Sequence, residues 1–358
     1  MLCPLAKEEG FPPNSQSRLV KLLKPEPNNT HRPAMLSLSD VQAAQKAVKP
    51  YITCTPLVHS VYLSKLCCAK IYLKLENQQI TNSFKVRGAF NKLLHLTQRE
   101  KRLGIITASA GNHGQAVAYA AKKLGFSARI VVPTNTPHVK VEGIRRWGAD
   151  LVLFGDCYDE AEAHAKMLAK KDGCAYISPY NDPLIIAGHG TMGLEIVETL
   201  SNVDAIVVPV GGGGLISGIA VAAKGLKPDV EIVGVQSEAS PVMYDSLRAG
   251  RIVEAPKALT IAEGLSGGIE KGALTFEIAQ KFVDKMLLVK EATIRRAVAL
   301  LCVHEHVVAE GSGAAAIAPL LEDASLFKGK RVACVVTGGN IDEELLKAIL
   351  STERQQVS

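Results

Sequence analysis

Short apolar runs alternate with longer amphipathic stretches along most of this chain. A run such as Ile206–Val210 is uniformly apolar, as expected of a strand buried on both faces, whereas residues 84–94 are apolar at every third or fourth position. The predicted strands are 105–106, 128–132, 151–154, 206–210, 232–235 and 332–336. Strands that alternate with helices predict a doubly wound α/β fold with a mostly parallel sheet.

The two ends of the chain depart from this pattern. Prolines and asparagines interrupt residues 1–35, so we expect a disordered extension there and a short tail at 351–358. The extension lacks the apolar core of a secretion signal, and its Glu8, Glu9 and Glu26 are unlike an organelle transit peptide. No stretch is long and apolar enough to cross a membrane, so we expect a cytoplasmic protein with no membrane partner.

Composition mainly excludes functions. The 358 residues, 47% of them hydrophobic, suffice for two lobes of ordinary domain size. The net charge of +6 is spread along the chain without an arginine-rich run, so we expect no nucleic-acid partner. The eight cysteines include no Cys-x-x-Cys pair, as is usual in a reducing compartment. His304 and His306 stand two positions apart, so they would not share one helix face as zinc ligands.

The first candidate for chemistry is the glycine run Gly211–Gly214, which follows an apolar strand and precedes a predicted helix. Backbone N–H groups and the helix dipole make such a turn a binding site for a phosphate. A tight turn without ligand is the plain alternative. A nucleoside-triphosphate loop would need Gly-x-x-x-x-Gly-Lys-Ser/Thr, and a nicotinamide site would need an acid about 20 residues further on, where the next strand ends in Gln236.

The second candidate is Lys85, within Ser83-Phe84-Lys85. An amine is a nucleophile only when it is deprotonated, so burial or the neighbouring Arg87 would have to lower its pKa from about 10.4. Taken alone, Lys85 and Arg87 are equally well read as solvated charges at the start of a helix.

Five motifs in sequence order resemble the fold-type II pyridoxal-phosphate (PLP) enzymes, within the branch of threonine/serine dehydratases and serine racemases. They are Ser-Phe-Lys-x-Arg-Gly-Ala at 83–89, Ser-Ala-Gly-Asn-His at 109–113, Ala-Gly-His-Gly-Thr at 187–191, Val-Gly-Gly-Gly-Gly-Leu at 210–215 and Gly-Gly-Asn-Ile-Asp at 338–342. The resemblance spans roughly residues 37–350. It implies a two-lobed, tryptophan synthase β-like fold, with a small lobe (104–180) inserted into a large PLP-binding lobe (36–103 and 181–350). The chain stops soon after the last motif, so it is closest in pattern to the short catabolic threonine dehydratases, which lack a C-terminal regulatory domain.

The resemblance assigns roles to the matching positions. Lys85 would hold the cofactor as a Schiff base and later remove the α-proton of the substrate, and Gly211, Gly212, Gly213 and Gly214 would hold the cofactor phosphate. Asn112 would donate a hydrogen bond to the 3′ oxygen of the cofactor ring. Donors for the substrate carboxylate would come from a helix start, formed by Ser109, Gly111, Asn112 and His113.

Thr337 occupies the position at which this family places a neutral side chain, usually serine, against the ring nitrogen. A hydroxyl stabilises a protonated ring less than a carboxylate does, so the ring stores negative charge poorly. Elimination tolerates this because the leaving β-hydroxyl carries the electrons away. The resemblance therefore implies a PLP-dependent L-threonine/L-serine ammonia-lyase, which releases a 2-oxo acid and ammonia.

Ala110 separates this activity from racemisation. Racemases of the branch have serine at this position, as the proton donor on the ring face opposite the lysine, and alanine has no proton to donate. Water or His113 as an alternative donor stays open.

No metal site is expected. The carboxylates with which animal serine racemases bind magnesium or calcium correspond here to Gln236 and Val242, and such cations need several oxygen ligands. Glu238 lies nearby as a partial substitute. Glu310, within Glu-Gly-Ser-Gly, has the shape of a family motif and is expected near the cofactor ring or in a structural role.

Three hypotheses remain open from the sequence. The first is the threonine/serine ammonia-lyase, with bulkier substrates such as phenylserine or 3-hydroxyaspartate included. The second is a serine racemase, and the third is a PLP-binding regulatory protein without chemistry. In each case the partners are a small amino acid and, by resemblance, further copies of the chain in a homo-oligomer.

Overall fold

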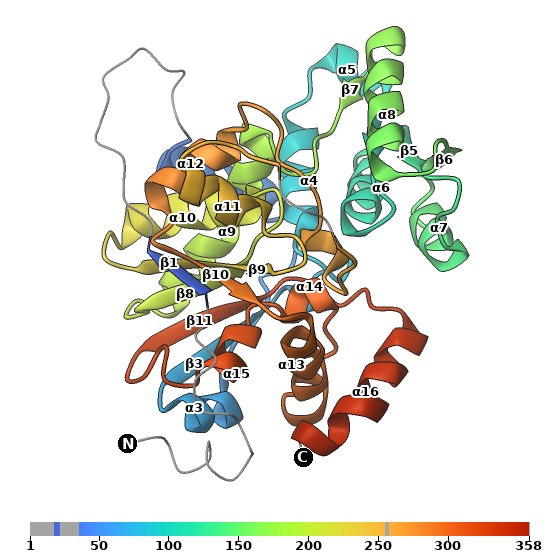
Figure 1. The fold of residues 1–358 in the computed structure, drawn as a ribbon. Coiled ribbons are helices and arrows are strands. Elements are labelled where there is room, and N and C mark those ends of the chain that lie inside the picture. Colours follow the sequence, from blue (N-terminus) through green and yellow to red (C-terminus); the bar gives the residue numbers. More distant parts are fainter. Residues whose placement is uncertain (1–17, 22–35, 255–257, 358) are drawn as a thin grey trace.

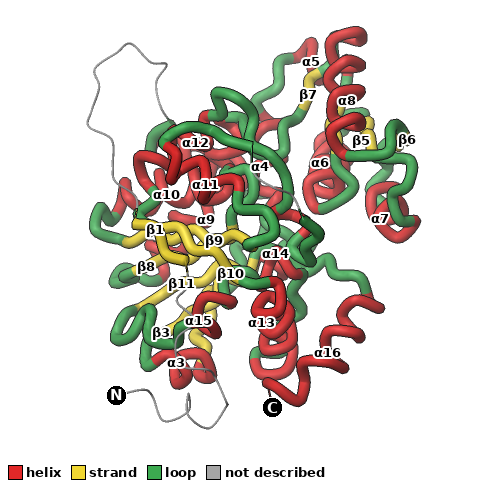
Figure 2. Tube along the Cα trace, viewed as in Figure 1, coloured by secondary structure: helices red, strands yellow, loops and turns green. Residues whose placement is uncertain are grey.

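The computed structural model of the protein describes residues 18–21, 36–254 and 258–357, which form two α/β lobes of unequal size (Figure 1). A seven-stranded sheet forms the centre of the larger lobe, and a four-stranded sheet forms the centre of the smaller one. Figure 2 shows the strands of the large sheet as one layer with helices on both sides. The predicted α/β fold with mostly parallel sheets is confirmed.

The large sheet is parallel except at its two edges, where β1 and β2 run antiparallel to their neighbours. In spatial order its strands are β1 (Arg18–Lys21), β10 (Lys285–Val289), β9 (Glu231–Ser237), β8 (Ala205–Pro209), β11 (Arg331–Val336), β3 (Lys70–Leu75) and β2 (Leu57–Ser60). The small sheet is parallel throughout, in the order β6 (Asp150–Leu153), β5 (Ala128–Val132), β4 (Ile105–Ala108) and β7 (Ala175–Tyr176). All four of its strands lie in the range expected for the small lobe.

Fifteen described α-helices and two short 3₁₀ helices accompany the strands. Three helices belong to the small lobe: α6 (Asn112–Leu124), α7 (His138–Arg145) and α8 (Tyr158–Asp172). The others are α2 (Leu38–Val48), α3 (Val61–Cys67), η1 (Glu76–Gln78), α4 (Lys85–Leu94), α5 (Gln98–Leu103), α9 (Pro183–Thr199), α10 (Gly214–Leu226), α11 (Val242–Ala249), η2 (Glu263–Leu265), α12 (Leu274–Phe282), α13 (Glu291–His304), α14 (Gly311–Ala314), α15 (Ala318–Glu322) and α16 (Glu343–Val357).

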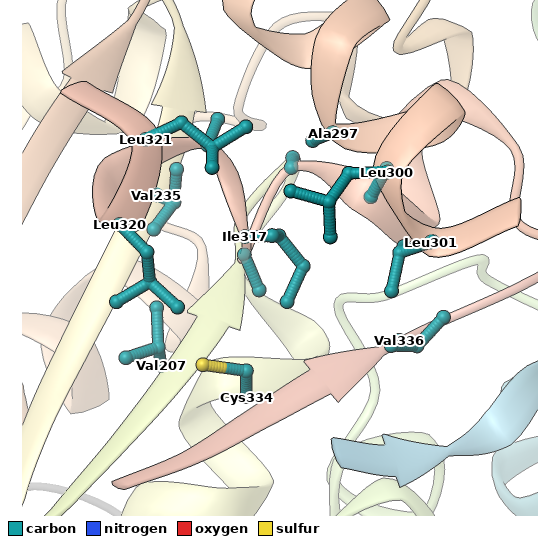
Figure 3. Close-up of a cluster of buried hydrophobic side chains, with 14 of the residues drawn as sticks. Val207, Val235, Ala297, Leu300, Leu301, Ile317, Leu320, Leu321, Cys334 and Val336 are labelled. Atoms are coloured by element: carbon teal, nitrogen blue, oxygen red, sulfur yellow. The ribbon is translucent and has the colours of Figure 1, made fainter. Parts of the chain in front are cut away.

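Each face of the large sheet buries its own apolar core. On one face α9, α10, α11 and α12 pack against the strands, and on the other face α3, α13, α15 and α16 do so (Figure 1). Figure 3 shows the second core, where Leu300 of α13 and Leu320 of α15 lie over Val207 and Cys334 of neighbouring strands. Because both faces are covered, β8 is apolar at every position, and so are residues 232–235 of β9 and 332–336 of β11, as their uniform sequence predicted.

The parallel strands direct the loops that follow them to one edge of the sheet. β8 leads into Gly211–Gly214, and β11 leads into residues 337–340. In open parallel sheets, ligands bind outside the carboxyl ends of the strands. This edge of the large sheet is therefore where a site is expected to form.

One expectation differs from the structure. Residues 18–21 lie in the range expected to be a disordered extension, yet they form β1, which pairs antiparallel with β10 from Arg18 opposite Leu288 to Lys21 opposite Lys285. The physical reason is that β10 would otherwise present an unpaired edge to solvent, and a short β-prone segment satisfies it. The rest of the expected extension lies outside the described residues.

Candidate active site

Lys85 is the first residue of α4, and backbone pairing fixes the segment before it. Ser83 forms an isolated antiparallel bridge with Gly338, and the N–H of Phe84 donates to the carbonyl oxygen of Thr337 at 3.1 Å. The lysine is thereby joined to the loop that follows β11. A lysine motif and a glycine loop more than 250 residues apart in sequence are thus neighbours in the fold.

The Lys85 amine has the properties that a nucleophile requires. Its Nζ donates to the carbonyl oxygen of Pro179 at 2.7 Å, in the segment that returns from the small lobe to the large one. Burial lowers the pKa of the amine to about 8, while the carboxylate of Glu310 acts in the opposite direction. A substantial fraction of the amine is therefore neutral at physiological pH, which Schiff-base chemistry needs.

Arg87 does not take the role that its position in sequence suggested. We expected its charge to help lower the pKa of Lys85, but the guanidinium is already paired with two carboxylates. It contacts Glu76 at 2.8 Å and Glu195 at 2.6 Å, and all three side chains are buried or nearly so. Although burial opposes the charge, Glu76 and Glu195 together raise the pKa of Arg87, so it stays ionised and electrically compensated.

The same ion cluster holds α4 in place. Lys74 of β3 adds a second cation, 2.6 Å from Glu195 of α9, so that the cluster contains two positive and two negative charges. The four side chains come from β3, the 3₁₀ turn after it, α4 and α9. The cluster therefore fixes the helix that begins with Lys85 to the sheet on one side and to α9 on the other.

The glycine loop has a conformation and packing that other residues would disrupt. Gly213 has φ of +89°, and a β-carbon there would lie 2.7 Å from Cε of Met243. A β-carbon on Gly212 would lie 2.6 Å from the ring of Tyr180. The hydroxyl of Thr275 donates to the carbonyl oxygen of Gly212 at 2.7 Å. The loop is held without side chains at the start of α10, where free N–H groups and the helix dipole suit a phosphate.

Two consecutive residues bring the lysine and the glycine loop together. Pro179 accepts the hydrogen bond from Lys85, and the ring and backbone of Tyr180 lie against Gly212 and Gly214. The hydroxyl of Tyr180 accepts a hydrogen bond from the N–H of Glu270 at 3.0 Å. Sequence analysis did not identify Tyr180, because it lies outside the motifs. Its contact with the glycine loop is revealed by Gly212 and Gly214, since a β-carbon at either position would collide with Tyr180.

Thr337 lies at the end of β11 and is almost fully buried. Its hydroxyl donates to the carbonyl oxygen of Ser312 at 3.3 Å, a long bond that a better acceptor can replace. The side chain at this position is neutral, as the sequence predicted for the residue opposite a ring nitrogen. Its assignment to the ring nitrogen stays a prediction.

Ser109, Gly111 and Asn112 lie where β4 leads into α6. Gly111 is the N-cap of α6, its N–H is bonded to the Ser109 hydroxyl at 3.2 Å, and Ser109 and Gly111 are accessible to solvent. A β-carbon on Gly114 would come within 2.2 Å of the Ser109 carbonyl oxygen, so a glycine is required one turn into the helix. The free N–H groups at this helix start can bind a carboxylate.

His113 is placed differently from its neighbours. Its side chain is buried, and Nε2 lies 3.1 Å from the Thr107 hydroxyl and 3.2 Å from the carbonyl oxygen of Ile177. Burial and the nearby Lys85 lower its pKa to about 3, so the ring is neutral at physiological pH. Its backbone remains at the helix start, but Nε2 faces the interior of the small lobe.

Asn112 connects the two lobes through its carboxamide. Its Nδ2 donates to Oε1 of Glu310 at 2.7 Å, and its Oδ1 accepts from Nδ2 of Asn340 at 2.7 Å. Gly338 lies against this pair, since a β-carbon there would be 2.8 Å from the Glu310 carboxylate. Glu310 thus lies beside the Gly-Gly-Asn loop, and the structure brings it to a residue expected to bind the cofactor.

His189 of the Ala-Gly-His-Gly-Thr motif lies against the first turn of α4. It is buried in α9, its ring contacts Phe84 edge-on at 4.7 Å between centroids, and the space it fills exists because residue 88 is glycine. Burial, followed by the charge of Lys85, keeps its pKa well below the ordinary value. It is therefore a neutral packing group behind Phe84.

Two further features concern metals and membranes. In the described part of the chain, no three His, Cys, Asp or Glu side chains are grouped as a metal site. Gln236, where the sequence departs from the metal-binding racemases, is buried and accepts a hydrogen bond from the N–H of Tyr244 at 2.8 Å. No helix within residues 36–254 and 258–357 is long and apolar enough to span a bilayer.

Proteins of known sequence resemble this chain over most of its length. An L-threonine ammonia-lyase of Thermotoga maritima is 45% identical over 318 residues, which cover 88% of this chain and 79% of the relative. A catabolic L-threonine dehydratase, TdcB, of Staphylococcus aureus is 42% identical over 312 residues, which cover 86% of this chain and 90% of the relative.

Solved structures extend the comparison to the fold. The processed form of threonine deaminase isoform 2 from Solanum lycopersicum superposes with a TM-score of 0.84 at 35% identity, over 92% of this chain and 98% of that one. Maize serine racemase superposes with a TM-score of 0.83 at 31% identity, over 90% of this chain and 99% of that one. Residues 48–338 match the family described as "Pyridoxal-phosphate dependent enzyme". With a buried lysine, a glycine loop for a phosphate and this agreement in sequence, the chain belongs to the pyridoxal-phosphate-dependent enzymes.

Proposed function

We propose that this protein is an L-threonine/L-serine ammonia-lyase, which eliminates water from a β-hydroxy amino acid. The observation that carries the proposal is the Lys85 amine, whose pKa is lowered to about 8 and which is joined to the glycine loop through Pro179 and Tyr180. The names of the relatives that are 41–45% identical agree with this activity.

The site fits pyridoxal phosphate. The N–H groups of Gly211–Gly214 would bind the phosphate, Lys85 the carbonyl carbon, Asn112 the ring oxygen and Thr337 the ring nitrogen. The fit rests on a loop without side chains, which packs so closely on the Tyr180 ring that it has no room for a β-carbon on Gly212. When bound, the cofactor supplies an electron-withdrawing ring that stabilises negative charge at the substrate α-carbon.

The chain's own groups would carry out the proton transfers. The substrate carboxylate would bind the N–H groups at the start of α6, which places its α-carbon near Lys85. The Lys85 amine would accept the α-proton, the bond from the β-carbon to oxygen would break, and the hydroxyl would leave as water with the proton that Lys85 gives up. A water molecule then replaces the nitrogen of the dehydrated product, which yields one 2-oxo acid and one ammonia per substrate.

A racemase is the second candidate, because the fold matches serine racemases as well as it matches threonine deaminases. Two residues favour elimination. Ala110, on the loop between Ser109 and Gly111, has no proton to donate. His113, the alternative donor, is neutral, with a pKa near 3, and its Nε2 faces Thr107 and Ile177.

Thr337 favours elimination for a separate reason. A hydroxyl leaves the ring nitrogen without the full negative partner that a carboxylate would provide, so charge at the α-carbon is short-lived. Loss of the β-hydroxyl removes this negative charge from the α-carbon, because the leaving group takes the electrons with it. We further propose a small amino acid as the partner of this site, a cytoplasmic location and a homo-oligomeric assembly, as in the resemblance on which those expectations rest.

Incubation of the purified protein and pyridoxal phosphate with L-threonine, L-serine and D-serine in turn tests the activity. The assay would follow 2-oxo acid release together with the serine enantiomer ratio. We expect 2-oxobutyrate from L-threonine and pyruvate from L-serine, without D-serine, and no product from Lys85→Ala. D-serine that accumulates ahead of pyruvate would replace this proposal by the racemase. If the protein is a racemase, Ala110→Ser would raise D-serine formation little. If it is an ammonia-lyase, Ala110→Ser should introduce D-serine formation.

A further inference from the structure

The side chain of Asn112 is bound at both ends by residues of the other lobe. Asn112 begins α6 of the small lobe, whereas Glu310 and Asn340 follow α13 and β11 of the large lobe. Both hydrogen bonds are 2.7 Å long, and they join residues 198 and 228 positions apart in the sequence. Contacts of this kind set the relative position of the two lobes as well as the orientation of one carboxamide.

Donor and acceptor chemistry permits only one orientation of this carboxamide. A carboxylate can only accept, so the group facing Glu310 must be the Asn112 NH₂. Asn340 contributes its own NH₂ to the opposite end, so the group facing it must be the Asn112 oxygen. Rotation by 180° would place two oxygens together at Glu310 and two NH₂ groups together at Asn340, with the loss of both bonds.

Asn340 is itself fixed, so it cannot follow such a rotation. Its NH₂ also donates to the carbonyl oxygen of Thr81 at 3.0 Å, and its Oδ1 accepts from Nδ2 of Asn82 at 3.3 Å. The N–H of Gly339 donates to the carbonyl oxygen of Asn82 at 2.9 Å. These partners lie three and four residues before Lys85. The orientation of Asn112 is therefore tied to the segment that carries the reactive lysine.

We propose that Glu310 and Asn340 are positioning residues that hold the Asn112 carboxamide so that its second N–H faces the 3′ oxygen of the cofactor, and that loss of the Glu310 charge weakens this arrangement. The inference rests on the assignment of Asn112 to the ring oxygen. Of the two hydrogens on Nδ2, Glu310 takes one, and the other remains to be donated. An ionised ring oxygen is the acceptor for which a fixed N–H is most effective.

The surroundings of Glu310 make its charge sensitive to pH in the physiological range. Burial raises the pKa of its carboxyl to about 7, with a further rise from Glu263 of η2 and opposing effects from Asn112 of α6, the N–H of Asn340 and Lys140 of α7. The Glu310 carboxylate also acts on Lys85 of α4, whose pKa it raises. Above pH 7 the carboxylate accepts strongly from Asn112. Below it the protonated group accepts less well, and its own proton needs a new acceptor.

The first test observes Asn112 directly, without cofactor and without turnover. The apoprotein would be labelled with ¹⁵N-asparagine, and the Asn112 side-chain resonances would be assigned from their absence in Asn112→Ser. We expect these resonances to shift with pH with a midpoint near 7, and the shift to vanish in Glu310→Gln, which keeps the shape of the side chain. Asn112 resonances that stay constant between pH 6 and 8 in the unsubstituted protein would overturn the proposal.

The second test measures cofactor binding where lysine chemistry cannot contribute. In a Lys85→Ala background, pyridoxal phosphate binds without a covalent bond, so its Kd reports the non-covalent contacts. We expect the Kd of the parent Lys85→Ala variant to change with pH around 7. The added Glu310→Gln substitution should remove this change. Asn340→Ala should raise Kd roughly fivefold at pH 8, the effect of one hydrogen bond. Titration of the cofactor phosphate also changes Kd with pH, but it does so equally in every variant and cancels when the variants are compared.

Glu238→Gln is the matched control, because it removes an exposed carboxylate that lies outside the site. It should leave both the Asn112 resonances and the Kd unchanged. Equal Kd values for the parent, Glu310→Gln and Asn340→Ala, measured at pH 6 and at pH 8, would contradict the positioning role. Neither measurement depends on which amino acid is the substrate, so failure here is distinct from failure of the ammonia-lyase assignment.

Discussion

The Lys85 amine is hydrogen-bonded to the carbonyl oxygen of Pro179, 2.7 Å away, in the segment by which the chain re-enters the large lobe. The amine would have to give up this hydrogen bond before it could react with a cofactor bound at the glycine loop. The availability of the amine is therefore linked to the position of the segment that joins the lobes. The next residue, Tyr180, contacts the glycine loop, so the same segment touches both ends of the site.

The reactivity of Lys85 should follow its lowered pKa. When the apoprotein is mixed with pyridoxal phosphate, the rate at which the visible absorbance of the lysine-bound cofactor appears should rise with pH and level off above about 8. Glu310→Gln should move the midpoint to lower pH, because Glu310 raises the pKa of Lys85. A midpoint near 10.5, the ordinary lysine value, would show that burial does not activate the amine.

Gly212→Ala should abolish cofactor binding while the protein stays folded. The added methyl group would lie 2.6 Å from the Tyr180 ring, and overpacking of this kind costs about 1–3 kcal/mol of stability. Equilibrium binding of pyridoxal phosphate and thermal unfolding would be measured together. Tyr180→Ala, added to Gly212→Ala, should recover stability. If the double variant is no more stable than Gly212→Ala, the contact with Tyr180 is not the reason for the glycine.

Arg87→Met should lower the free energy of unfolding by about 3–5 kcal/mol, since it leaves Glu76 and Glu195 buried with less compensation. Denaturant titration would measure this change. Arg145→Met is the control, because Arg145 pairs with Glu142 at 3.0 Å but both side chains are about half exposed. That pair should contribute no more than about 1 kcal/mol. Equal losses from the two substitutions would argue against the buried cluster.

Glu310→Gln should stabilise the apoprotein progressively as pH rises. The carboxyl has a pKa of about 7 in the folded state against 4.5 ordinarily, so folding disfavours its ionised form. The native protein therefore loses stability between pH 4.5 and 7, and the glutamine variant lacks this loss. The difference should approach the order of 3 kcal/mol above pH 7. A difference that is constant from pH 5 to 8 would show an ordinary pKa for Glu310.

Thr337→Asp should destabilise the apoprotein and impair elimination in the holoprotein. The new carboxylate would be almost fully buried beside the Ser312 carbonyl oxygen, where burial disfavours its negative charge until a ring nitrogen is protonated. Pyridoxal phosphate should therefore raise the Tm of this variant more than it raises that of the native protein. Thr337→Ser, which keeps a hydroxyl, should behave as the native protein in both assays. Unchanged elimination with aspartate would refute the role assigned to a neutral side chain.

The sequence predicted the parts of this site that are expressed as motifs. The glycine loop could be identified from its own residues, Lys85 was one of two equal alternatives until the family resemblance was added, and the role of Thr337 came from that resemblance. The bond from Lys85 to Pro179 could not be predicted, since it uses a backbone carbonyl oxygen that any residue provides. The same limit applies to β1, because pairing with an exposed edge depends on the strand that it meets more than on its own residues.

Long-range side-chain pairs were the other gap. Glu310 was expected near the ring or in a structural role, yet its contact with Asn112 spans 198 residues and no local pattern encodes it. Arg87 was expected to act on Lys85, its neighbour in sequence. Its partners in the structure are Glu76 and Glu195, which come from two other elements. In both cases the charge of one group is set by residues that only the folded chain brings close.

The cluster of Lys74, Glu76, Arg87 and Glu195 also determines how the protein responds to ionic strength. Dissolved ions screen charges at the surface, where pairs such as Arg145 and Glu142 lie, but they do not reach charges enclosed by protein. Two cations and two anions in contact also leave little net field for counterions to act on. Concentrated salt should therefore weaken the exposed pairs of both lobes while the helix that begins at Lys85 keeps its place on the sheet.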